Sequence, residues 1–288
     1  MIEPQNQKVT IPGLRAKKAS GEKIVALTAY DFPVARILDA AGVDIILVGD
    51  SLGMVVLGYE TTVPVTMDEM IHHTKPVARA ARRSLVIADM PYMSYHVSAE
   101  ASVTNAFRFV KEAGASGVKI EGASGPRLKL IEALVEADIP VMGHVGLTPQ
   151  SVNRLGSFKV RGGEPAEAER IIEAAENLEG AGAFAVVLEC IPMELAGRIT
   201  ERLKVPTIGI GAGPLCDGQI LVFHDLMGCE GGYLPKFVKK YADLNRVISE
   251  AVGRYREDVR NGTFPDDAHA YHGKAAPAEE MTKKTTGR

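Results

Sequence analysis

Short apolar runs alternate with amphipathic segments along most of this chain, and this alternation restricts the folds that the chain can adopt. The runs contain five to seven residues and are rich in Val and Ile, which is typical of parallel strands buried on both faces. We expect eight strands, the last being the least regular, at residues 24–28, 44–49, 85–89, 117–121, 140–145, 183–189, 206–211 and 219–223.

The amphipathic segments carry the end signals of helices. Asp31, Thr66 and Ser98 each stand where an N-cap is expected, and Glu69 is placed to complete a capping box with Thr66. We predict helices at residues 32–41, 67–82, 99–113, 125–137, 165–180 and 193–203. Strand–helix units in series predict an α/β fold, a (β/α)8 TIM barrel, with a doubly wound sheet as the alternative.

The length and composition are consistent with one such barrel. The chain has 288 residues, of which 46% are hydrophobic, so it can bury a large core as one unit. We therefore expect a single barrel domain over residues 1–288, with an ordered core at about residues 8–270. The polar segment at about residues 273–288 is expected to be a flexible tail.

Charge, cysteine content and hydropathy exclude several classes of protein. A formal net charge of −3 gives no support to a nucleic-acid-binding surface, and no apolar run approaches the roughly 20 residues that span a membrane. The N-terminal segment lacks the pattern of a secretory signal. Cys190, Cys216 and Cys229 form neither a disulfide framework nor a CxxC pair, so free thiols and a cytoplasmic location are expected.

Ionisable residues gather where five consecutive predicted strands end. They are Asp50, Asp89, Lys119, Glu121, His144 and Glu189. Parallel strands bring their carboxyl ends to one mouth of a barrel, where active sites form. Side chains alternate along a strand, so Lys119 and Glu121 are expected on one face, with Val118 and Ile120 on the other.

Each of these residues also has a structural explanation. An Asp at a strand end often caps the next helix, and Lys119 with Glu121 would form an ion pair. His144 could hydrogen-bond in the core, and Glu189 could cap a turn. The functional interpretation is favoured because burying several charges together is costly unless a site uses them.

Two long connections and two weaker motifs need separate interpretation. Residues 49–66 and 146–163 leave the same mouth and are typical of active-site covers. The glycine-rich run at residues 209–213 resembles a phosphate-binding turn, although glycine there also permits a tight turn. His72 and His73 lack the spacing of a zinc-binding helix, so packing or solvation is favoured.

The carboxylates of the cluster suit a hard divalent cation. Mg²⁺ prefers oxygen ligands, uses one or two carboxylates and leaves positions for water and substrate. A bound Mg²⁺ can chelate a 2-keto acid and stabilise its enolate. A nearby lysine can add electrostatic stabilisation, and a further carboxylate can accept the carbon-bound proton.

Seven strings together resemble the ketopantoate hydroxymethyltransferase family, and the resemblance extends over about residues 8–270. The strings are LTAYDFPVA (27–35), VGDSLGMVVLGYETTVPVTMDEM (48–70), ADMPYMSY (88–95), VKIEG (118–122), GHVGLTPQSVNRLGSFKVRG (143–162), LECIP (188–192) and GIGAGPLCDGQILVFHD (209–225). The resemblance implies a TIM barrel of the phosphoenolpyruvate/pyruvate type. It also implies hydroxymethyl transfer from 5,10-methylenetetrahydrofolate to 3-methyl-2-oxobutanoate, giving 2-dehydropantoate for pantothenate biosynthesis. Mg²⁺ and a homodecamer of two pentameric rings are implied as well.

The same resemblance implies roles for individual residues. These are metal ligation by Asp50, Asp89 and Glu121, substrate binding by Asp50, Ser51, Asp89 and Lys119, proton abstraction by Glu189, and an undefined role for His144. Two alternatives stay open. One is another Mg²⁺-dependent 2-keto acid lyase of the same superfamily, and the other is a non-catalytic scaffold that forms a ring.

Overall fold

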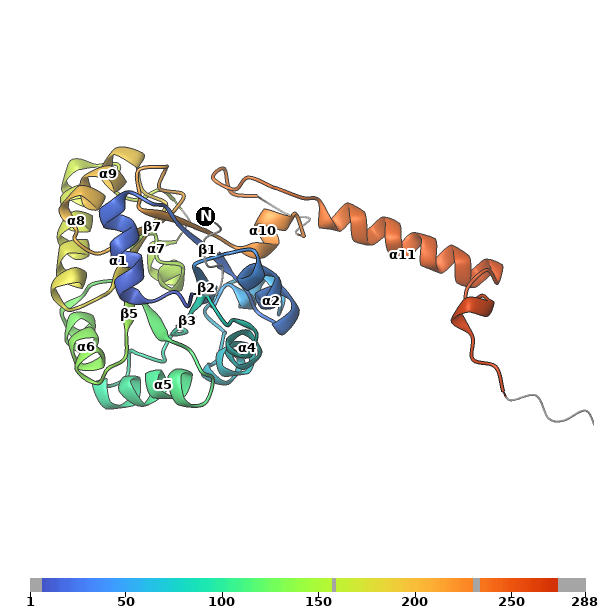
Figure 1. Ribbon diagram of the computed structural model, residues 1–288. Helices are drawn as coiled ribbons and strands as arrows, with labels where there is room; N and C mark the ends of the chain where they lie inside the picture. Colours follow the sequence, from blue (N-terminus) through green and yellow to red (C-terminus); the bar gives the residue numbers. More distant parts are fainter. Residues whose placement is uncertain (1–6, 157–158, 230–233, 274–288) are drawn as a thin grey trace, which may run out of the picture. The chain divides into compact units, whose positions relative to one another are not determined.

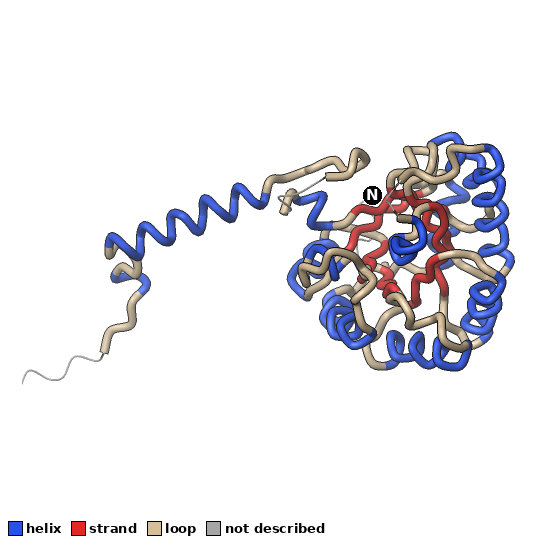
Figure 2. The backbone as a smooth tube through the Cα atoms, turned by 180° about the vertical axis from the view of Figure 1, so that it is seen from behind, coloured by secondary structure: helices blue, strands red, loops and turns tan. Residues whose placement is uncertain are grey.

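Eight parallel strands close into a barrel in chain order, with β1 paired to β8 (Figures 1 and 2). The computed structural model describes residues 7–156, 159–229 and 234–273. The strands are β1 Ile24–Thr28, β2 Ile45–Val48, β3 Leu85–Asp89, β4 Gly117–Glu121, β5 Val141–Gly146, β6 Ala185–Glu189, β7 Thr207–Ile210 and β8 Gly218–Leu221. The predicted (β/α)8 barrel is confirmed, including its eighth strand, and the doubly wound alternative is wrong.

Most of the helices pack around the barrel (Figure 1). They are α1 Ile11–Ser20, α2 Phe32–Ala40, α3 Leu52–Val55, α4 Met67–Ala80, α5 Ala99–Lys111, α6 Gly125–Glu136, α7 Val152–Leu155, α8 Pro165–Gly180, α9 Met193–Arg202 and α10 Phe223–Met227, with a 3-10 turn η1 at Pro149–Ser151. All six predicted helices are present, and Thr66 and Glu69 form the predicted capping box. The two long connections contain α3 and η1–α7, so they are not structureless.

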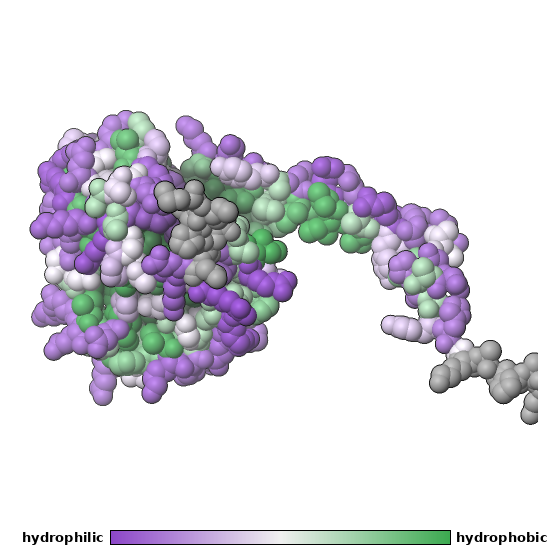
Figure 3. All heavy atoms as spheres, in the orientation of Figure 1, coloured by the Kyte–Doolittle hydropathy of each residue, from purple (hydrophilic) through white to green (hydrophobic). Residues whose placement is uncertain are grey.

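Contacts within the chain define two compact units, one ending at Ala242 and the other starting at Asp243. This division differs from the expected single domain over residues 1–288. The second unit contains α11 Leu244–Asn261 and a 3-10 turn, η2 Asp267–His269. Exposed apolar side chains run along α11 (Figure 3), namely Val247, Ile248, Val252, Tyr255 and Val259. Residues 274–288, which hold nearly all of the expected tail, lie outside the described residues.

Two apolar layers hold the first unit together. The barrel interior is filled from alternate strand positions, such as Ile45 and Leu47, and Leu14 of α1 joins this cluster. The intervening positions, such as Val118 and Ile120, belong to the outer layer between strands and helices. Strand β4 therefore has the predicted alternation, and its polar side chains are free to face the mouth.

The carboxylate of Asp39 on α2 ties that helix to the turn before β3. It accepts backbone hydrogen bonds from Arg82 at 3.1 Å, Arg83 at 2.9 Å and Ser84 at 2.7 Å. Partial burial acts to raise the pKa of Asp39, but these three donors outweigh it and hold the pKa below its usual range. The contribution to stability is thus present above the unfolded pKa and is lost as pH falls through the folded pKa.

Replacing Asp39 by alanine is expected to lower the free energy of unfolding by about 1–3 kcal/mol at pH 7, because three backbone donors lose a charged acceptor. The difference from wild type should shrink as pH falls below about 4, where the carboxylate is protonated in the unfolded chain. Chemical denaturation across this pH range measures both effects. The exposed Glu136→Ala is the control, and a deficit that is independent of pH would contradict the ionic explanation.

Candidate active site

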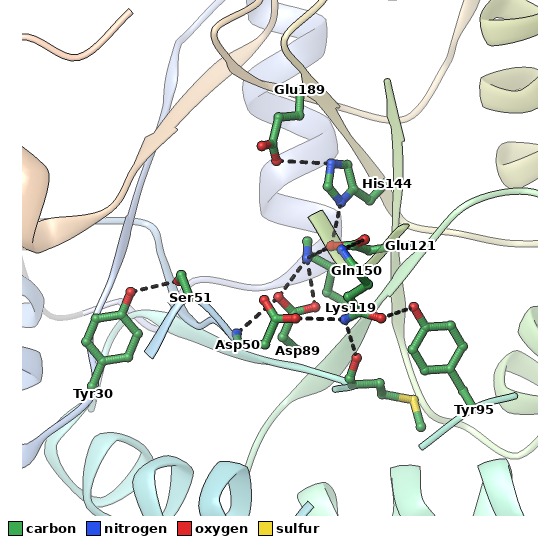
Figure 4. Close-up of polar contacts among 11 residues, drawn as sticks. Tyr30, Asp50, Ser51, Asp89, Tyr95, Lys119, Glu121, His144, Gln150 and Glu189 are labelled. Atoms are coloured by element: carbon green, nitrogen blue, oxygen red, sulfur yellow. Dashed lines mark hydrogen bonds and ion pairs between the residues drawn. The ribbon is translucent and has the colours of Figure 1, made fainter. Parts of the chain in front are cut away.

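The structure brings together the six ionisable residues that end strands β2 to β6 (Figure 4). Asp50, Asp89, Lys119, Glu121 and His144 are buried, with exposed fractions of 5% or less, and Glu189 is half-buried. Parallel register explains the arrangement, because Asp89 pairs with Lys119 and Glu121 pairs with His144 across neighbouring strands. The predicted cluster at the C-terminal mouth therefore exists in the fold.

Lys119 is the cationic centre of the cluster. Its Nζ donates to both carboxylate oxygens of Asp89 at 2.7 Å and lies 3.7 Å from Oε1 of Glu121. The backbone N–H of Asp50 donates to Oδ2 of Asp89 at 3.4 Å. Two aspartates from neighbouring strands thus converge beside one buried ammonium group.

Burial and mutual charge shift the pKa values of these groups strongly. Burial raises the pKa of Asp50 well above its usual range, and the charges of Asp89 and Glu121 raise it further. Burial also raises the pKa of Asp89, although Lys119 offsets part of that effect. Burial alone would lower the pKa of Lys119, but the three surrounding carboxylates reverse the shift and keep the ammonium charged.

His144 lies between two carboxylates. Its Nδ1 is 3.5 Å from Oε1 of Glu121, and its Nε2 is 3.2 Å from Oε2 of Glu189. Burial would lower the pKa of His144, but Glu121 and Glu189 raise it to about 9, so the imidazole is cationic near neutral pH. Gly146 permits this approach of β5 to β6, because it has a φ of 98° and a Cβ there would collide with the carbonyl oxygen of Glu189.

Gln150 is a buried member of the site that sequence reasoning missed. Its Nε2 donates to Oδ2 of Asp50 and to the carbonyl oxygen of Met90, both at 2.9 Å, and its N–H donates to Oε2 of Glu121 at 3.2 Å. Its Oε1 accepts from the hydroxyl of Tyr95 at 2.5 Å. A prediction based on ionisable residues at the ends of strands does not include a neutral amide on η1. The sequence signal for Gln150 was its place in the long connection after β5.

Ser51 lies next to Asp50 at the start of α3, half-buried. Its Oγ is 2.9 Å from the hydroxyl oxygen of Tyr30, a contact that sequence reasoning also missed. Gly49 leaves room for this hydroxyl, because a Cβ there would lie 2.7 Å from Oγ of Ser51.

His73, one of the two adjacent histidines on α4, has a structural role, because its Nδ1 lies 2.7 Å from the carbonyl oxygen of Tyr30.

The glycines of the run at residues 209–213 are explained by close packing. A Cβ on Gly211 would lie 2.8 Å from Phe237, and one on Gly213 would lie 2.7 Å from Met193. Phosphate binding is not needed to explain glycine here. Cys190 and Cys216 are free thiols, as expected from their spacing.

The carboxylates at the barrel mouth are the possible ligands of a metal ion. Within the described ranges no three or more His, Cys, Asp or Glu side chains are arranged to hold a metal, so the expected three-carboxylate centre is not preformed. Glu121 contacts His144 and Gln150 instead. The raised pKa of Asp50 shows that the carboxylates near it oppose its ionisation, which a bound cation would relieve. Asp50 and Asp89 offer hard oxygens only, which fits Mg²⁺ bound through one or two carboxylates and water.

A sequence model of the ketopantoate hydroxymethyltransferase family matches residues 8–267. The chain belongs to this family. The 3-methyl-2-oxobutanoate hydroxymethyltransferase of Thermoanaerobacter sp. (strain X514) is 56% identical over 265 residues, covering 92% of this chain and 96% of that protein. The protein of the same name from Moorella thermoacetica is 56% identical over 267 residues, covering 93% and 99%. As a member of a hydroxymethyltransferase family, the chain is an enzyme.

Solved structures of other enzymes share this barrel fold, and one of them is a member of the phosphoenolpyruvate mutase/isocitrate lyase superfamily. The phosphoenolpyruvate phosphomutase of Streptomyces platensis subsp. rosaceus matches with a TM-score of 0.59 and 17% identity over 88% of each chain. A 2,3-dimethylmalate lyase matches with a TM-score of 0.57 and 16% identity over 94% of this chain and 91% of that one. The barrel is therefore of the predicted phosphoenolpyruvate/pyruvate type. None of the helices in the described part of the chain has the length and apolar character to cross a membrane.

Proposed function

We propose that this enzyme transfers a hydroxymethyl group from 5,10-methylenetetrahydrofolate to 3-methyl-2-oxobutanoate, giving 2-dehydropantoate in pantothenate biosynthesis. The observation that carries the proposal is the cluster in which Lys119 and His144 contact the carboxylates of Asp89, Glu121 and Glu189 at the barrel mouth. The names of the relatives specify the same acceptor and the same transferred group. An enolate forms only where negative charge is stabilised, and this cluster has the cationic groups to do so.

Asp50 and Asp89 are the proposed ligands of Mg²⁺, with Glu121 at or just behind the metal. The cation would supply Lewis-acid polarisation of the keto oxygen. A solved phosphonopyruvate hydrolase of the same fold was crystallised with oxalate and Mg²⁺, at 17% identity and a TM-score of 0.55 over 90% of this chain and 92% of that one. Oxalate resembles the carbonyl and carboxylate oxygens of a 2-keto acid, which supports the same class of ligand here.

The proposed chemistry starts with the keto acid held by Ser51 and Lys119. Glu189 takes the proton from C3, and the electron pair of that C–H bond becomes the enolate, whose charge Lys119 faces. Glu189 is suited to this task because it is half-buried and accessible, whereas Glu121 is buried against its partners. The enolate carbon then bonds to the methylene carbon of the donor as one of the two C–N bonds of that carbon breaks. Water displaces the second nitrogen and supplies the oxygen of the new hydroxyl group. Tetrahydrofolate leaves with the C3 proton and one proton of the water on its two nitrogens.

His144 is proposed to position Glu189. Its ring is buried, and its Nε2 lies 3.2 Å from Oε2 of Glu189. A cationic imidazole stabilises the ionised carboxylate that must accept a proton.

The test of this function is a product assay with 3-methyl-2-oxobutanoate and 5,10-methylenetetrahydrofolate, with and without Mg²⁺. We expect 2-dehydropantoate only when all three are present. Turnover of a 2-keto or 2-hydroxy acid without the folate would instead indicate a lyase of the same superfamily. Absence of Mg²⁺-dependent keto acid binding in calorimetry would indicate a non-catalytic scaffold.

Assembly and location belong to the same proposal. A homodecamer is supported by the family resemblance, and size-exclusion chromatography with light scattering tests it. A cytoplasmic location is supported by the free thiols of Cys190 and Cys216, because reducing compartments keep cysteines unpaired.

Replacing Gln150 by alanine is expected to weaken Mg²⁺ binding by about 10- to 100-fold, because Asp50 loses the amide that orients it. The Mg²⁺-dependent shift in melting temperature measures this effect without relying on activity. Gln219→Ala is the matched control, since its Nε2 donates to the carbonyl oxygen of Gly213 away from the cluster. An unchanged Mg²⁺ response in the Gln150 variant, together with lower stability, would assign Gln150 a structural role only.

A further inference from the structure

We infer that a cavity beside the metal site binds the carboxylate tail of the folate donor, an inference that rests on the proposed function. The cavity has a volume of about 280 Å³ and begins at Glu121. Its wall is formed by the β4–α6 connection and by the connection after β5, with Ser124, Arg127, Thr148, Ser151 and Arg154 among the lining residues. A ligand seated in it would reach the reaction centre without passing through the barrel core.

Two arginines and one carboxylate, that of Glu121, are the charged groups that line this cavity. Arg127 on α6 and Arg154 on α7 line it, and in the described part of the chain neither forms a salt bridge with a carboxylate. Arg127 contacts Oγ of Ser124 at 3.2 Å and Nε2 of His96 at 2.6 Å, and its guanidinium lies 5.3 Å from the ring centre of Tyr95. Its Nε is buried without a hydrogen-bond partner. A partly buried guanidinium that is held in place without a paired anion is suited to bind the carboxylate of a ligand.

The remaining groups of the wall favour a carboxylate. The hydroxyls of Ser124, Thr148 and Ser151 can donate hydrogen bonds, and Oγ1 of Thr148 is already 3.1 Å from Oγ of Ser151. Ser124 precedes α6, a helix of 12 residues whose N-terminal dipole favours negative charge. Guanidinium forks bind planar carboxylates through paired hydrogen bonds, whereas a neutral pterin ring gains little from two cations.

Size and position favour the donor rather than the keto acid. Drug-sized ligands occupy about 300–1,000 Å³, so this cavity can hold one end of the folate but not all of it. The proposed anchors of the keto acid, Ser51 and Lys119, are not among the residues that line it. A folate has its carboxylates on the glutamate end and its transferable carbon on the pterin. The tail in this cavity would therefore leave the pterin free to approach the enolate.

The test compares two donors in the Arg127→Gln and Arg154→Gln variants. With 5,10-methylenetetrahydrofolate the KM for the donor should rise by about 10- to 100-fold, as expected for lost charge-assisted hydrogen bonds. With the tetrahydropteroate analogue, which lacks the glutamate, variants and wild type should have the same KM. Exchange of the keto acid C3 proton into deuterated water without a donor should stay at the wild-type rate. Arg170→Gln, on an exposed part of α8, is the control.

Three outcomes would overturn the inference. A raised KM for the keto acid, or slower C3 exchange, would assign the arginines to the other substrate. An equal penalty with both donors would show that they act through local structure. An unchanged KM for the folate in both variants would place its tail elsewhere. Failure of the proposed function is distinguishable, because wild-type protein would then form no product with either donor.

Discussion

Exchange of the C3 proton of 3-methyl-2-oxobutanoate is expected to fall by about 10²- to 10⁴-fold when Glu189 is replaced by glutamine, because the amide cannot accept that proton. Nuclear magnetic resonance in deuterated water follows the exchange directly, with Mg²⁺ and without the folate donor. Binding of Mg²⁺ and keto acid should be retained, since Glu189 contacts His144 rather than the paired aspartates. The substitution therefore separates proton transfer from ligand binding.

The control for this experiment is Glu194→Gln, an exposed glutamate on α9. Its exchange rate should equal that of wild type. If the Glu189 variant keeps its exchange rate, another group accepts the proton. Measuring the exchange rate after replacing His144 by alanine would then test whether this buried neighbour of Glu189 takes part in the exchange.

Replacing Asp50 by alanine is expected to weaken Mg²⁺ binding by at least about 100-fold and to abolish product formation with it. Without metal the variant should be as stable as wild type or more so, because a buried carboxylate surrounded by like charges costs free energy. In wild type, bound Mg²⁺ should raise the melting temperature through linkage to folding, and this rise should be lost in the variant. Thermal unfolding with and without MgCl₂ measures both effects.

Asp44 provides a matched control at the opposite end of β2. It is buried like Asp50, but it pairs with Lys17 at 3.1 Å and Arg83 at 3.3 Å. Asp44→Ala should lower the melting temperature and keep the Mg²⁺-dependent rise. A full Mg²⁺ response in the Asp50 variant would remove that residue from the proposed metal site.

The fold could be predicted where local chemistry and burial agree. Strand β4 and helix α4 are examples, since one has alternating faces and the other has a complete capping box. Helices α1 and α11 were missed. They precede the first strand and follow the last one, so they lie outside the alternation of strands and helices on which the prediction was based.

The ionisable part of the site was predictable because parallel topology brings the ends of successive strands together. Chain order alone located Asp89 and Lys119 on neighbouring strands, and β3 and β4 pair them directly. The contacts of Gln150, Tyr95 and Tyr30 could not be predicted, since they depend on how connections fold back over the mouth. Neutral side chains in such connections leave no periodic signal.

Because the side chains of β4 alternate between two faces, the activity of the enzyme depends on the correct register of this strand. Sliding this strand by a single residue would turn Lys119 and Glu121 outward and present Val118 and Ile120 to the substrate. The altered barrel would bury these two charges in the apolar outer layer and would lose the Lys119 ammonium from its mouth. An insertion or deletion within this strand is accordingly expected to abolish activity, and activity after refolding measures how much of the population reached the native pairing.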